Sequence, residues 1–287
     1  MTDTPDHVAE PLTTGELARW LRPRARDSHK GDHGRALCIG GDHGHGGAIM
    51  LAAEAALRCG AGLVDVVTRP AHVPALLARR PEAMVRAADD GAVPPALLAS
   101  ADAVLLGPGL GQDAWGAALF AQVLDAADGL QLVLDADALN LLAANPRPLP
   151  AGTVMTPHPG EAARLLGIAT AEVQRDRLAA LRQLCDRFGA VVVLKGAGTL
   201  VGAPGRGPRR VDAGNPGMAV GGMGDVLAGV IAALVAQGLA AADAAACGAL
   251  LHAGAGDAAA REGGQRGLLP ADLMPWLRRL ANPEPVP

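Results

Sequence analysis

Asp225 ends a glycine-rich stretch that begins at Asn215 and reads Asn-Pro-Gly-Met-Ala-Val-Gly-Gly-Met-Gly-Asp. The apolar residues 226–236 that follow are typical of a buried helix, so the free N–H groups of its first turn point back at the glycines. Such a helix start attracts anions through its dipole and its free donors. A carboxylate there makes chemical sense if it accepts a proton while the amides hold a phosphoryl group, which activates a hydroxyl against a nucleotide phosphate. The simpler interpretation is that Asp225 caps a helix behind a glycine loop.

A second glycine-rich stretch, Lys195-Gly-Ala-Gly-Thr199, follows the apolar residues 191–194. Its amides and its threonine hydroxyl can hold nucleotide phosphates or ribose, and Lys195 adds positive charge. The alternative is an ordinary glycine turn within a hairpin. The 25 basic residues include only two lysines, Lys30 and Lys195, and each is followed by glycine. This usage indicates that both positions need a compact ammonium group on a flexible stem.

Three acidic residues and a histidine follow other predicted strands. His158 lies between two prolines, which stiffen the stretch from Thr156 to Glu161 and aim both side chains reproducibly. Glu161 either caps the next helix or holds a divalent cation through water beside the phosphates. Asp135 and Asp137 are either turn residues or ligands suited to Mg²⁺.

Other chemistry is less well supported. The first glycine loops carry three histidines without a recognisable metal spacing, and these are expected to be polar loop residues: His33, His43 and His45. No G-x-S-x-G stretch or convincing Cys–His pair indicates covalent catalysis. What remains is electrostatic stabilisation of a phosphoryl group together with one carboxylate base.

Alternating strands and helices must position these side chains. Apolar runs bounded by glycine, proline or aspartate predict strands over 36–40, 63–68, 103–106, 130–134, 154–155 and 191–194. Helical patterns cover 13–21, 48–59, 72–80, 113–127, 160–167, 171–188, 224–237, 240–261 and 271–280. Residues 200–214 are expected to form a hairpin or a flap.

The alternation predicts an α/β fold in three layers, with a mainly parallel central sheet between helices. Most strands end in a Gly, Pro or Asp motif, so the functional groups should gather along one edge of the sheet. No linker, repeat or low-complexity tract divides the chain. We therefore expect a single domain over residues 1–287, with a flexible extension over about 1–12.

Composition excludes several classes of protein. The net charge of −4 and the scarcity of aromatic residues argue against nucleic-acid binding. Four scattered cysteines are expected to be small buried residues in a reducing compartment. The N-terminal residues have no apolar segment typical of a secretory signal, and the longest apolar run is too short to cross a bilayer. The protein is therefore expected to be cytoplasmic and to have no membrane partner.

Taken together and in order, the motifs resemble the bacterial ADP-dependent NAD(P)H-hydrate dehydratases, a ribokinase-like family. The resemblance covers roughly residues 30–260. It rests on Lys30-Gly-Asp-His-Gly34, Gly40-Gly41 with Gly47-Ala48, Gly107-Pro-Gly-Leu-Gly111, Thr156-Pro-His-Pro-Gly-Glu161, Lys195-Gly-Ala-Gly-Thr199 and the stretch from Asn215 to Asp225.

The resemblance implies a repair reaction on NADH or NADPH (NADHX and NADPHX) whose nicotinamide ring has been hydrated in the S configuration. Phosphorylation of the ring hydroxyl by ADP gives AMP and a phosphate ester, which eliminates phosphate and restores the cofactor. Asp225 would take the hydroxyl proton. The adenine nucleotide would be held by Lys195, Gly196, Ala197, Gly198, Thr199 and Gly224, and the hydrate by Ala48, Gly109, His158 and Asp225.

The resemblance also implies Mg²⁺ near Glu161 and a homotetramer. Some relatives carry an additional epimerase domain, whereas this chain resembles the form without it and is expected to work beside a separate epimerase. The first glycine loop departs from many relatives. It has Asp42 where a serine is common and His45 near the position of an aromatic residue, which changes the expected shape of the hydrate pocket.

Two other functions fit parts of the pattern. A ribokinase-like kinase for a thiazole alcohol or pyridoxal would use ATP and retain the phosphorylated product, but such relatives tend to have Asn where His158 stands. A nucleotide-binding regulator would keep the pocket without turnover, and an intact Asp225 argues against it.

Overall fold

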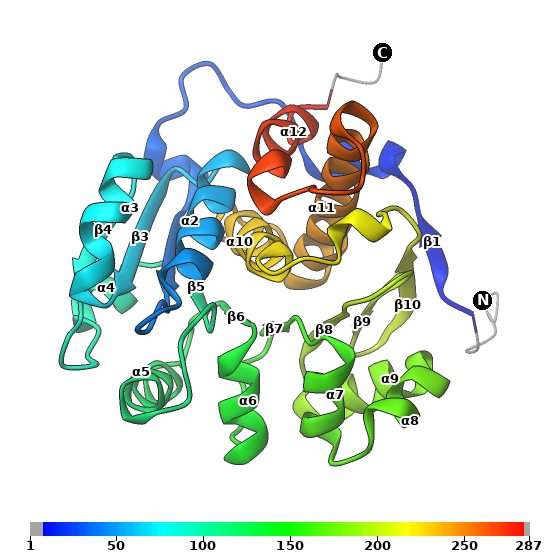
Figure 1. Ribbon diagram of the computed structural model, residues 1–287, viewed down its shortest axis with the longest axis horizontal. Coiled ribbons are helices and arrows are strands. Elements are labelled where there is room, and N and C mark those ends of the chain that lie inside the picture. The colour runs from blue at the N-terminus through cyan, green and yellow to red at the C-terminus, as the bar shows by residue number, and fades with distance from the viewer. Residues whose placement is uncertain (1–7, 284–287) are drawn as a thin grey trace.

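The computed structural model describes residues 8–283, which form one ten-stranded sheet with helices on both faces (Figure 1). The strand order is β1-β10-β9-β8-β7-β6-β5-β2-β3-β4. Neighbouring strands are parallel except for the pairs β8–β9 and β9–β10. The prediction of a mainly parallel sheet in a three-layer α/β fold is confirmed.

The strands are β1 (Glu10–Leu12), β2 (Arg35–Ile39), β3 (Leu63–Thr68), β4 (Met84–Ala87), β5 (Ala103–Leu106), β6 (Leu132–Leu134), β7 (Val154–Met155), β8 (Val191–Leu194), β9 (Thr199–Ala203) and β10 (Arg206–Val211). The α-helices are α1 (Leu17–Trp20), α2 (Gly46–Arg58), α3 (Val73–Arg79), α4 (Pro95–Ala99), α5 (Ala114–Asp125), α6 (Asp137–Ala144), α7 (Pro159–Leu166), α8 (Thr170–Arg175), α9 (Arg177–Phe188), α10 (Met223–Ala236), α11 (Ala241–Gly263) and α12 (Leu273–Leu280). Short 3₁₀ turns are η1 (Thr14–Glu16), η2 (Lys30–His33), η3 (Pro70–His72), η4 (Pro216–Met218) and η5 (Pro270–Asp272).

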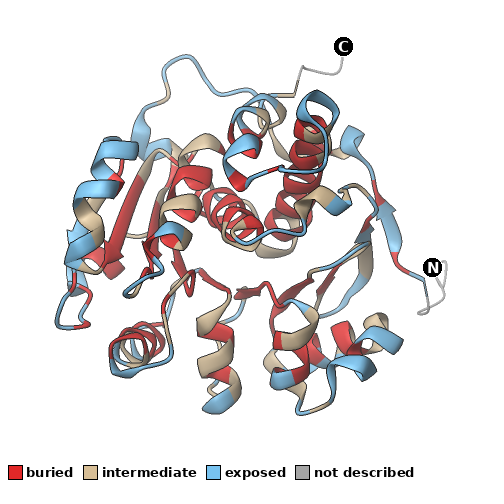
Figure 2. Ribbon diagram, in the orientation of Figure 1, coloured by how far each residue is buried: buried red, intermediate tan, exposed pale blue. Residues whose placement is uncertain are grey.

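Both faces of the sheet are covered. Helices α2, α10, α11 and α12 lie on one face, and α5, α6, α7 and α9 lie on the other (Figure 1). Strands β5 and β8 are buried along their whole length (Figure 2), as parallel strands between two helical layers must be. Their continuous apolar sequences follow from that position.

Small residues allow helices α2 and α10 to cross closely. A Cβ atom added at Gly229 would lie 2.1 Å from the carbonyl oxygen of Ala52. Almost every residue of α10 is buried, although this part of the chain has no aromatic side chain to fill space. Close backbone approach therefore replaces bulky side chains in the packing of this layer.

Several predicted elements need correction. The helix expected over 171–188 is two helices, because Asp176 has a non-helical backbone (φ −142°, ψ 84°) and its side chain accepts a hydrogen bond from the N–H of Ala179 to cap α9. Strand β4 and helices α4 and α6 were not predicted, since β4 is a partly exposed edge strand and both helices begin at proline or aspartate residues typical of turns. The segment 200–214 does contain a hairpin, formed by β9 and β10.

The expected flexible extension over 1–12 is wrong for its last residues. Strand β1 pairs in parallel with β10, and the side chains of Ala9 and Leu12 are buried. Residues 1–7 lie outside the described part of the chain. Within residues 8–283, no helix combines the length and the apolar character needed to cross a bilayer.

Candidate active site

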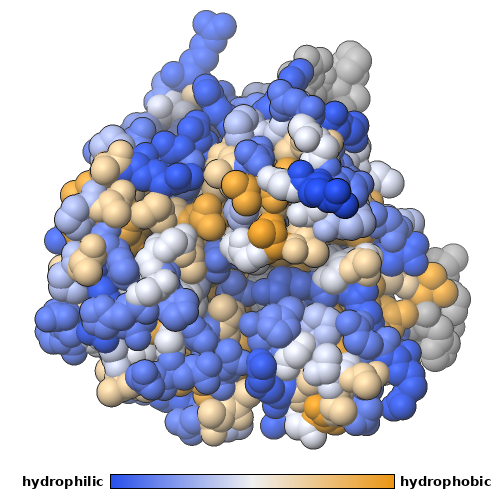
Figure 3. Space-filling model, in the orientation of Figure 1, coloured by the Kyte–Doolittle hydropathy of each residue, from blue (hydrophilic) through white to orange (hydrophobic). Residues whose placement is uncertain are grey.

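The functional motifs meet at one edge of the sheet. Strands β5, β6, β7 and β8 are consecutive neighbours, and each runs directly into a motif loop at its carboxyl end: 107–111, 135–137, 156–161 and 195–199. Parallel strands bring these loops side by side at the edge where open α/β sheets bind ligands. In the space-filling view, hydrophilic residues line a recessed band across the middle of the face shown (Figure 3).

Lys195 lies between two buried carboxylates. Its Nζ atom is 2.7 Å from Oδ1 of Asp135 and 3.8 Å from Oε2 of Glu161. The hydroxyl of Thr156 also donates to Oδ1 of Asp135, at 2.7 Å. An added Cβ at Gly224 would lie only 3.3 Å from the lysine Nζ, so the start of α10 packs closely against this ion pair.

His158 and Glu161 cap helix α7 reciprocally. The Nδ1 atom of His158 accepts a hydrogen bond from the N–H of Gly160 at 3.0 Å, and Oε2 of Glu161 accepts one from the N–H of His158 at 2.8 Å. The side-chain tip of His158 lies 3.3 Å from Oε1 of Glu161. The helix-capping alternative for Glu161 therefore holds, and the prolines aim both residues at the site.

Burial raises the pKa of Asp225 to about 7, with Asp135 adding to the effect and Lys195 opposing it. Burial likewise raises the pKa of Glu161 to about 7, partly opposed by Lys195. Burial alone would lower the pKa of Lys195, but the carboxylates of Asp135 and Glu161 outweigh it and the pKa is raised. Burial and the charge of Lys195 lower the pKa of His158. At neutral pH the site thus holds a cationic lysine beside two carboxyl groups poised to exchange a proton.

Asp225 lies in the first turn of α10, behind Gly222, whose left-handed backbone (φ 96°) forms the helix cap. The N–H groups of residues 221–225 have no acceptor within residues 8–283. Free donors at a helix start are a ready site for an anion. The half-buried carboxylate of Asp225 therefore lies beside free N–H groups, and its charge acts on Lys195.

Arg177, which was not predicted as a site residue, stabilises the turn 195–199. The guanidinium of Arg177 donates to the carbonyl oxygens of Leu194 (3.1 Å), Lys195 (3.3 Å) and Gly198 (3.0 Å), and also to that of Ala197. The guanidinium thus occupies the carbonyl groups of the turn. The N–H groups of residues 196–198 have no acceptor in the described chain. The turn can therefore present donors to phosphate.

Ala48 and Gly109 contact one another on the other side of the site. An added Cβ at Gly109, where φ is +59°, would lie 3.1 Å from Cβ of Ala48 and 2.6 Å from the carbonyl oxygen of His45. The N–H of Asp42 donates to the carbonyl of Gly109 at 2.6 Å. Any side chain at position 109 would therefore clash with the backbone at His45, just before α2.

The unusual Asp42 is held by a cation. Its Oδ1 accepts from Nε of Arg69 at 2.7 Å, and the Arg69 guanidinium lies 4.4 Å from the centre of the Trp115 ring. The Arg69 charge and hydrogen bonds lower the pKa of Asp42 against the effect of burial. His45 is exposed, and its Nδ1 lies 3.0 Å from the carbonyl oxygen of His43. Where many relatives have a serine, this chain therefore has an aspartate that forms an ion pair with Arg69.

Asp257 of α11 positions the glycine-rich stretch and was also not predicted. Its two carboxylate oxygens accept from the N–H of Gly214 and from Nδ2 of Asn215, both at 2.9 Å. Oδ1 of Asn215 in turn accepts from the N–H of Gly217 at 3.0 Å. Neither Asp257 nor Arg177 lies in a motif. The only sequence signal for Asp257 is a charged residue within an alanine-rich helical segment, and Arg177 has no local sequence signal at all.

The acidic residues of the site offer Mg²⁺ few free carboxylate ligands. Asp137 is engaged elsewhere, accepting from the N–H of Gly111 at 2.9 Å, while Asp135 is paired with Lys195. The described residues contain no group of three or more potential metal-binding side chains. Mg²⁺ commonly keeps several waters and uses one or two carboxylates with substrate phosphates, and Glu161 is compatible with that form of binding.

The remaining candidates lie outside this cluster. Lys30 is exposed and forms no ion pair within residues 8–283; the carbonyl oxygen of Lys30 packs against Gly62 instead. His33 contacts Ser28 at 3.0 Å, as a polar loop residue would. All four cysteines are buried and free, as expected.

The strand order, the layers and the glycine-rich loops at the carboxyl edge define a ribokinase-like α/β protein, a fold shared with solved structures of that superfamily. The family profile of NAD(P)H-hydrate dehydratase matches residues 36–279, and the chain belongs to this family.

Individual relatives agree with this assignment. The chain is 54% identical over 281 residues to the bifunctional NAD(P)H-hydrate repair enzyme Nnr of Coxiella burnetii, covering 95% of this chain and 56% of that protein. It is 42% identical to the ADP-dependent (S)-NAD(P)H-hydrate dehydratase of Neisseria meningitidis, covering 91% and 90% of the two chains. A structure of the ADP/ATP-dependent NAD(P)H-hydrate dehydratase of Bacillus subtilis, co-crystallised with ATP and Mg²⁺, superimposes with a TM-score of 0.84 at 28% identity and covers 95% and 97%. The chain spans about half the length of the bifunctional relatives it matches.

Proposed function

We propose that this protein is an ADP-dependent dehydratase that converts the S form of hydrated NADH or NADPH back to the intact cofactor. The observation that carries the proposal is the meeting of a half-buried carboxylate, a lysine and two sets of free backbone N–H groups at one sheet edge. The name of the Neisseria relative, which aligns over nearly its whole length, supports the choice of substrate and of ADP.

In the proposed reaction, the ring hydroxyl gives its proton to Asp225 as its oxygen attacks the β-phosphorus of ADP. The bond between that phosphorus and the bridging oxygen breaks, and AMP leaves with the electron pair. The free N–H groups of residues 221–225 stabilise charge on the transferred phosphoryl group. The ester then loses phosphate from one ring carbon and a proton from its neighbour, which restores the double bond. Phosphate leaves far more readily than hydroxide, so the nucleotide makes the elimination possible.

The nucleotide would be bound by the turn 195–199 and by the backbone at Gly224. Lys195 supplies charge to the phosphates, and Arg177 keeps the turn in shape. Ala48 and Gly109 would line the space for the damaged ring, with His158 at its rim. Glu161 would hold Mg²⁺ through water, and a bound Mg²⁺ would neutralise phosphate charge.

A vitamin-precursor kinase is the alternative, because the same site can transfer phosphate to an alcohol that does not eliminate. It differs in the product, which would be a stable phosphate ester made from ATP.

The test is to incubate the protein with hydrated NADPH and either ADP or ATP, and to follow the absorbance of the dihydronicotinamide ring. The proposal predicts recovery of that absorbance with ADP and release of AMP in equal amount. A stable phosphorylated thiazole alcohol or pyridoxal without cofactor recovery would establish the kinase instead. Nucleotide binding without any product would establish a regulator.

We further propose a homotetramer that acts in the cytoplasm beside a separate epimerase. The tetramer is proposed on the family resemblance alone, since the alanine-rich helices α10 and α11 are buried within the chain over most of their length. Sedimentation at four times the chain mass of 28.8 kDa is expected, and sedimentation as a monomer would contradict the assembly. Reporter fusions of the full-length protein should be found in the cytoplasm.

A further inference from the structure

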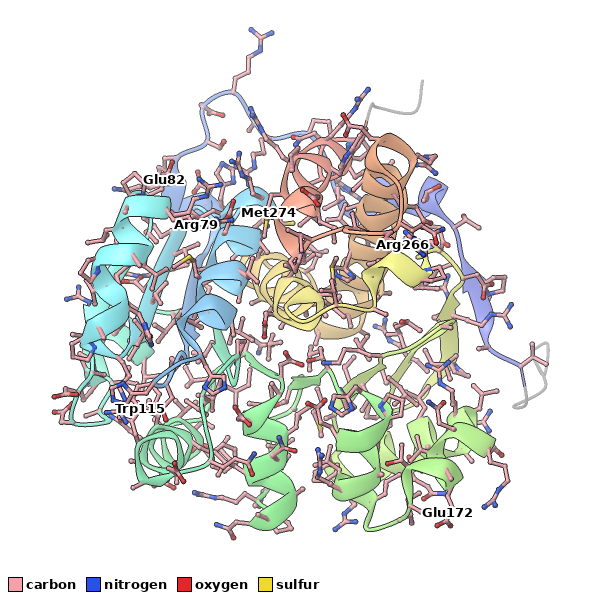
Figure 4. The ribbon with its side chains drawn as sticks, viewed as in Figure 1. Arg79, Glu82, Trp115, Glu172, Arg266 and Met274 are labelled. Carbon is pink, nitrogen blue, oxygen red and sulfur yellow. The ribbon has the colours of Figure 1, made fainter. Side chains whose placement is uncertain are left out.

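A basic groove lies between helix α2 and helix α12, outside the residues assigned to the active site. It consists of two pockets of 380 and 620 Å³ that share Arg58 and Arg278 in their walls. Volumes of this size are typical of sites for small molecules. Arg79 and Met274, which line the smaller pocket, lie close together in Figure 4.

Positive charge in this groove exceeds negative charge. Its walls contain six arginines and a single carboxylate, that of Glu54. Glu54 is buried and accepts from Nε of Arg79 at 2.7 Å and also from Arg80. This buried anchor fixes two guanidinium groups at the pocket wall and leaves the other four arginines without a carboxylate.

Those four arginines have no ion pair within residues 8–283: Arg22, Arg24, Arg58 and Arg278. Arg24 donates only to neutral acceptors, the carbonyl of Gly60 and the side chain of Gln237. In a chain whose net charge is −4, such a local excess of cations favours the binding of an anion. Guanidinium groups match phosphate oxygens in pairs of parallel hydrogen bonds.

The two pockets differ in their other walls. The smaller one is dominated by guanidinium groups, whereas the larger one also carries apolar surface from Leu21, Pro23 and Leu57. This combination suits a ligand with clustered phosphoryl groups and an organic part. A lone phosphate ion would leave most of the cations unpaired.

Residues next to the groove, outside its two pockets, pack against the candidate active-site loop. An added Cβ at Gly222 would lie 2.7 Å from Leu51 of α2 and 2.9 Å from Pro270, which precedes α12. Gly222 caps the helix that carries Asp225. A ligand held between α2 and α12 would therefore bind elements that pack directly against the phosphate-binding loop.

We propose that this groove is a second ligand site, which takes one organic phosphate with at least two adjacent phosphoryl groups. The site is distinct from the nucleotide site at Lys195, and it does not depend on the function proposed above.

The test is calorimetric titration of the full-length protein with inorganic tripolyphosphate in 150 mM salt, where screening suppresses loosely held surface anions. We expect binding in the groove to weaken at least about tenfold in the Arg58→Gln/Arg278→Gln variant, because it removes both shared guanidinium groups. The matched control is Arg187→Gln/Arg261→Gln, which removes the same charge from two exposed arginines elsewhere. Lys195→Gln should retain the groove site.

Equal loss in the groove and control variants would show unspecific attraction and overturn the proposal. So would unchanged binding in the groove variant, binding that disappears only in Lys195→Gln, or no binding to the wild-type protein. Orthophosphate should bind at least about tenfold more weakly than tripolyphosphate, since it engages fewer arginines; equal affinity would contradict the ligand class. The single variant Arg278→Gln, at an exposed position, provides the same comparison if the double variant does not fold.

Discussion

Lys195 is one of only two lysines in the chain, and its surroundings account for the choice of residue. It reaches Asp135 directly and Glu161 at longer range, while Gly224 leaves little space beside its ammonium group. A broad guanidinium would not fit between these groups without moving them. The ammonium therefore balances buried carboxylates and also faces the loop expected to hold phosphates.

Replacement of Lys195 by methionine should weaken ADP binding at least about tenfold and lower the free energy of unfolding by about 3 kcal/mol, because Asp135 would remain buried without its cation. Binding is measured by titration and stability by urea unfolding. Lys30→Met is the matched control, since Lys30 is exposed and unpaired within residues 8–283. Equal losses of ADP affinity and of stability in the two variants would contradict a specific role for Lys195.

Glu161 should make stability depend on pH. Burial raises its pKa from 4.5 to about 7, so between these values the folded protein keeps a proton that the unfolded chain has released. Its contribution is therefore most favourable below pH 4.5 and is lost as the pH rises through 7. Relative to Glu161→Gln, wild-type stability should fall by about 1–3 kcal/mol between pH 5 and 7.5. A difference that stays constant across this range would contradict the assignment.

At the scale of elements, α10 links the protein core to the site. Its first turn offers free amides and Asp225, while the rest of the helix is buried against α2. The close crossing at Gly229 sets the height of α10 above the sheet. A change there should act on the site through the position of the whole helix.

Gly229→Ala should destabilise the protein by about 1–3 kcal/mol, because the new methyl group would meet the carbonyl of Ala52 at 2.1 Å. Thermal or urea unfolding measures the change. Gly263→Ala, in the last turn of α11 with open space around it, is the control and should be neutral or slightly stabilising. Comparable destabilisation by both would show that lost backbone flexibility, and not the helix crossing, is responsible.

At the scale of the whole molecule, the buried strands could be predicted because they are continuous apolar runs bounded by glycine, proline or polar residues. Strands β3, β5, β7 and β8 were predicted at their observed bounds. The short strand β1 could not be, since its three residues gain their structure from pairing with β10 far along the chain. Its pairing covers part of an otherwise open sheet edge.

The motifs at the carboxyl ends of strands could also be predicted, because their glycines, prolines and charged residues are close together in the sequence. The residues that support them could not. Arg177 holds the turn 195–199 across the fold, and Asp257 holds the stretch after Gly214 from another helix. Such long-range contacts leave no pattern in a single sequence.

The most direct test of the account is the dehydration rate of Asp225→Asn under single-turnover conditions with saturating ADP. We predict a loss of about 10²–10⁴ in rate, the usual contribution of a general base, with an ADP dissociation constant within about threefold of wild type because the backbone N–H groups are unchanged. Burial raises the pKa of Asp225 to about 7, so the wild-type rate should rise with pH through that value. Near-full activity in the variant, with the same pH dependence as wild type, would contradict the account.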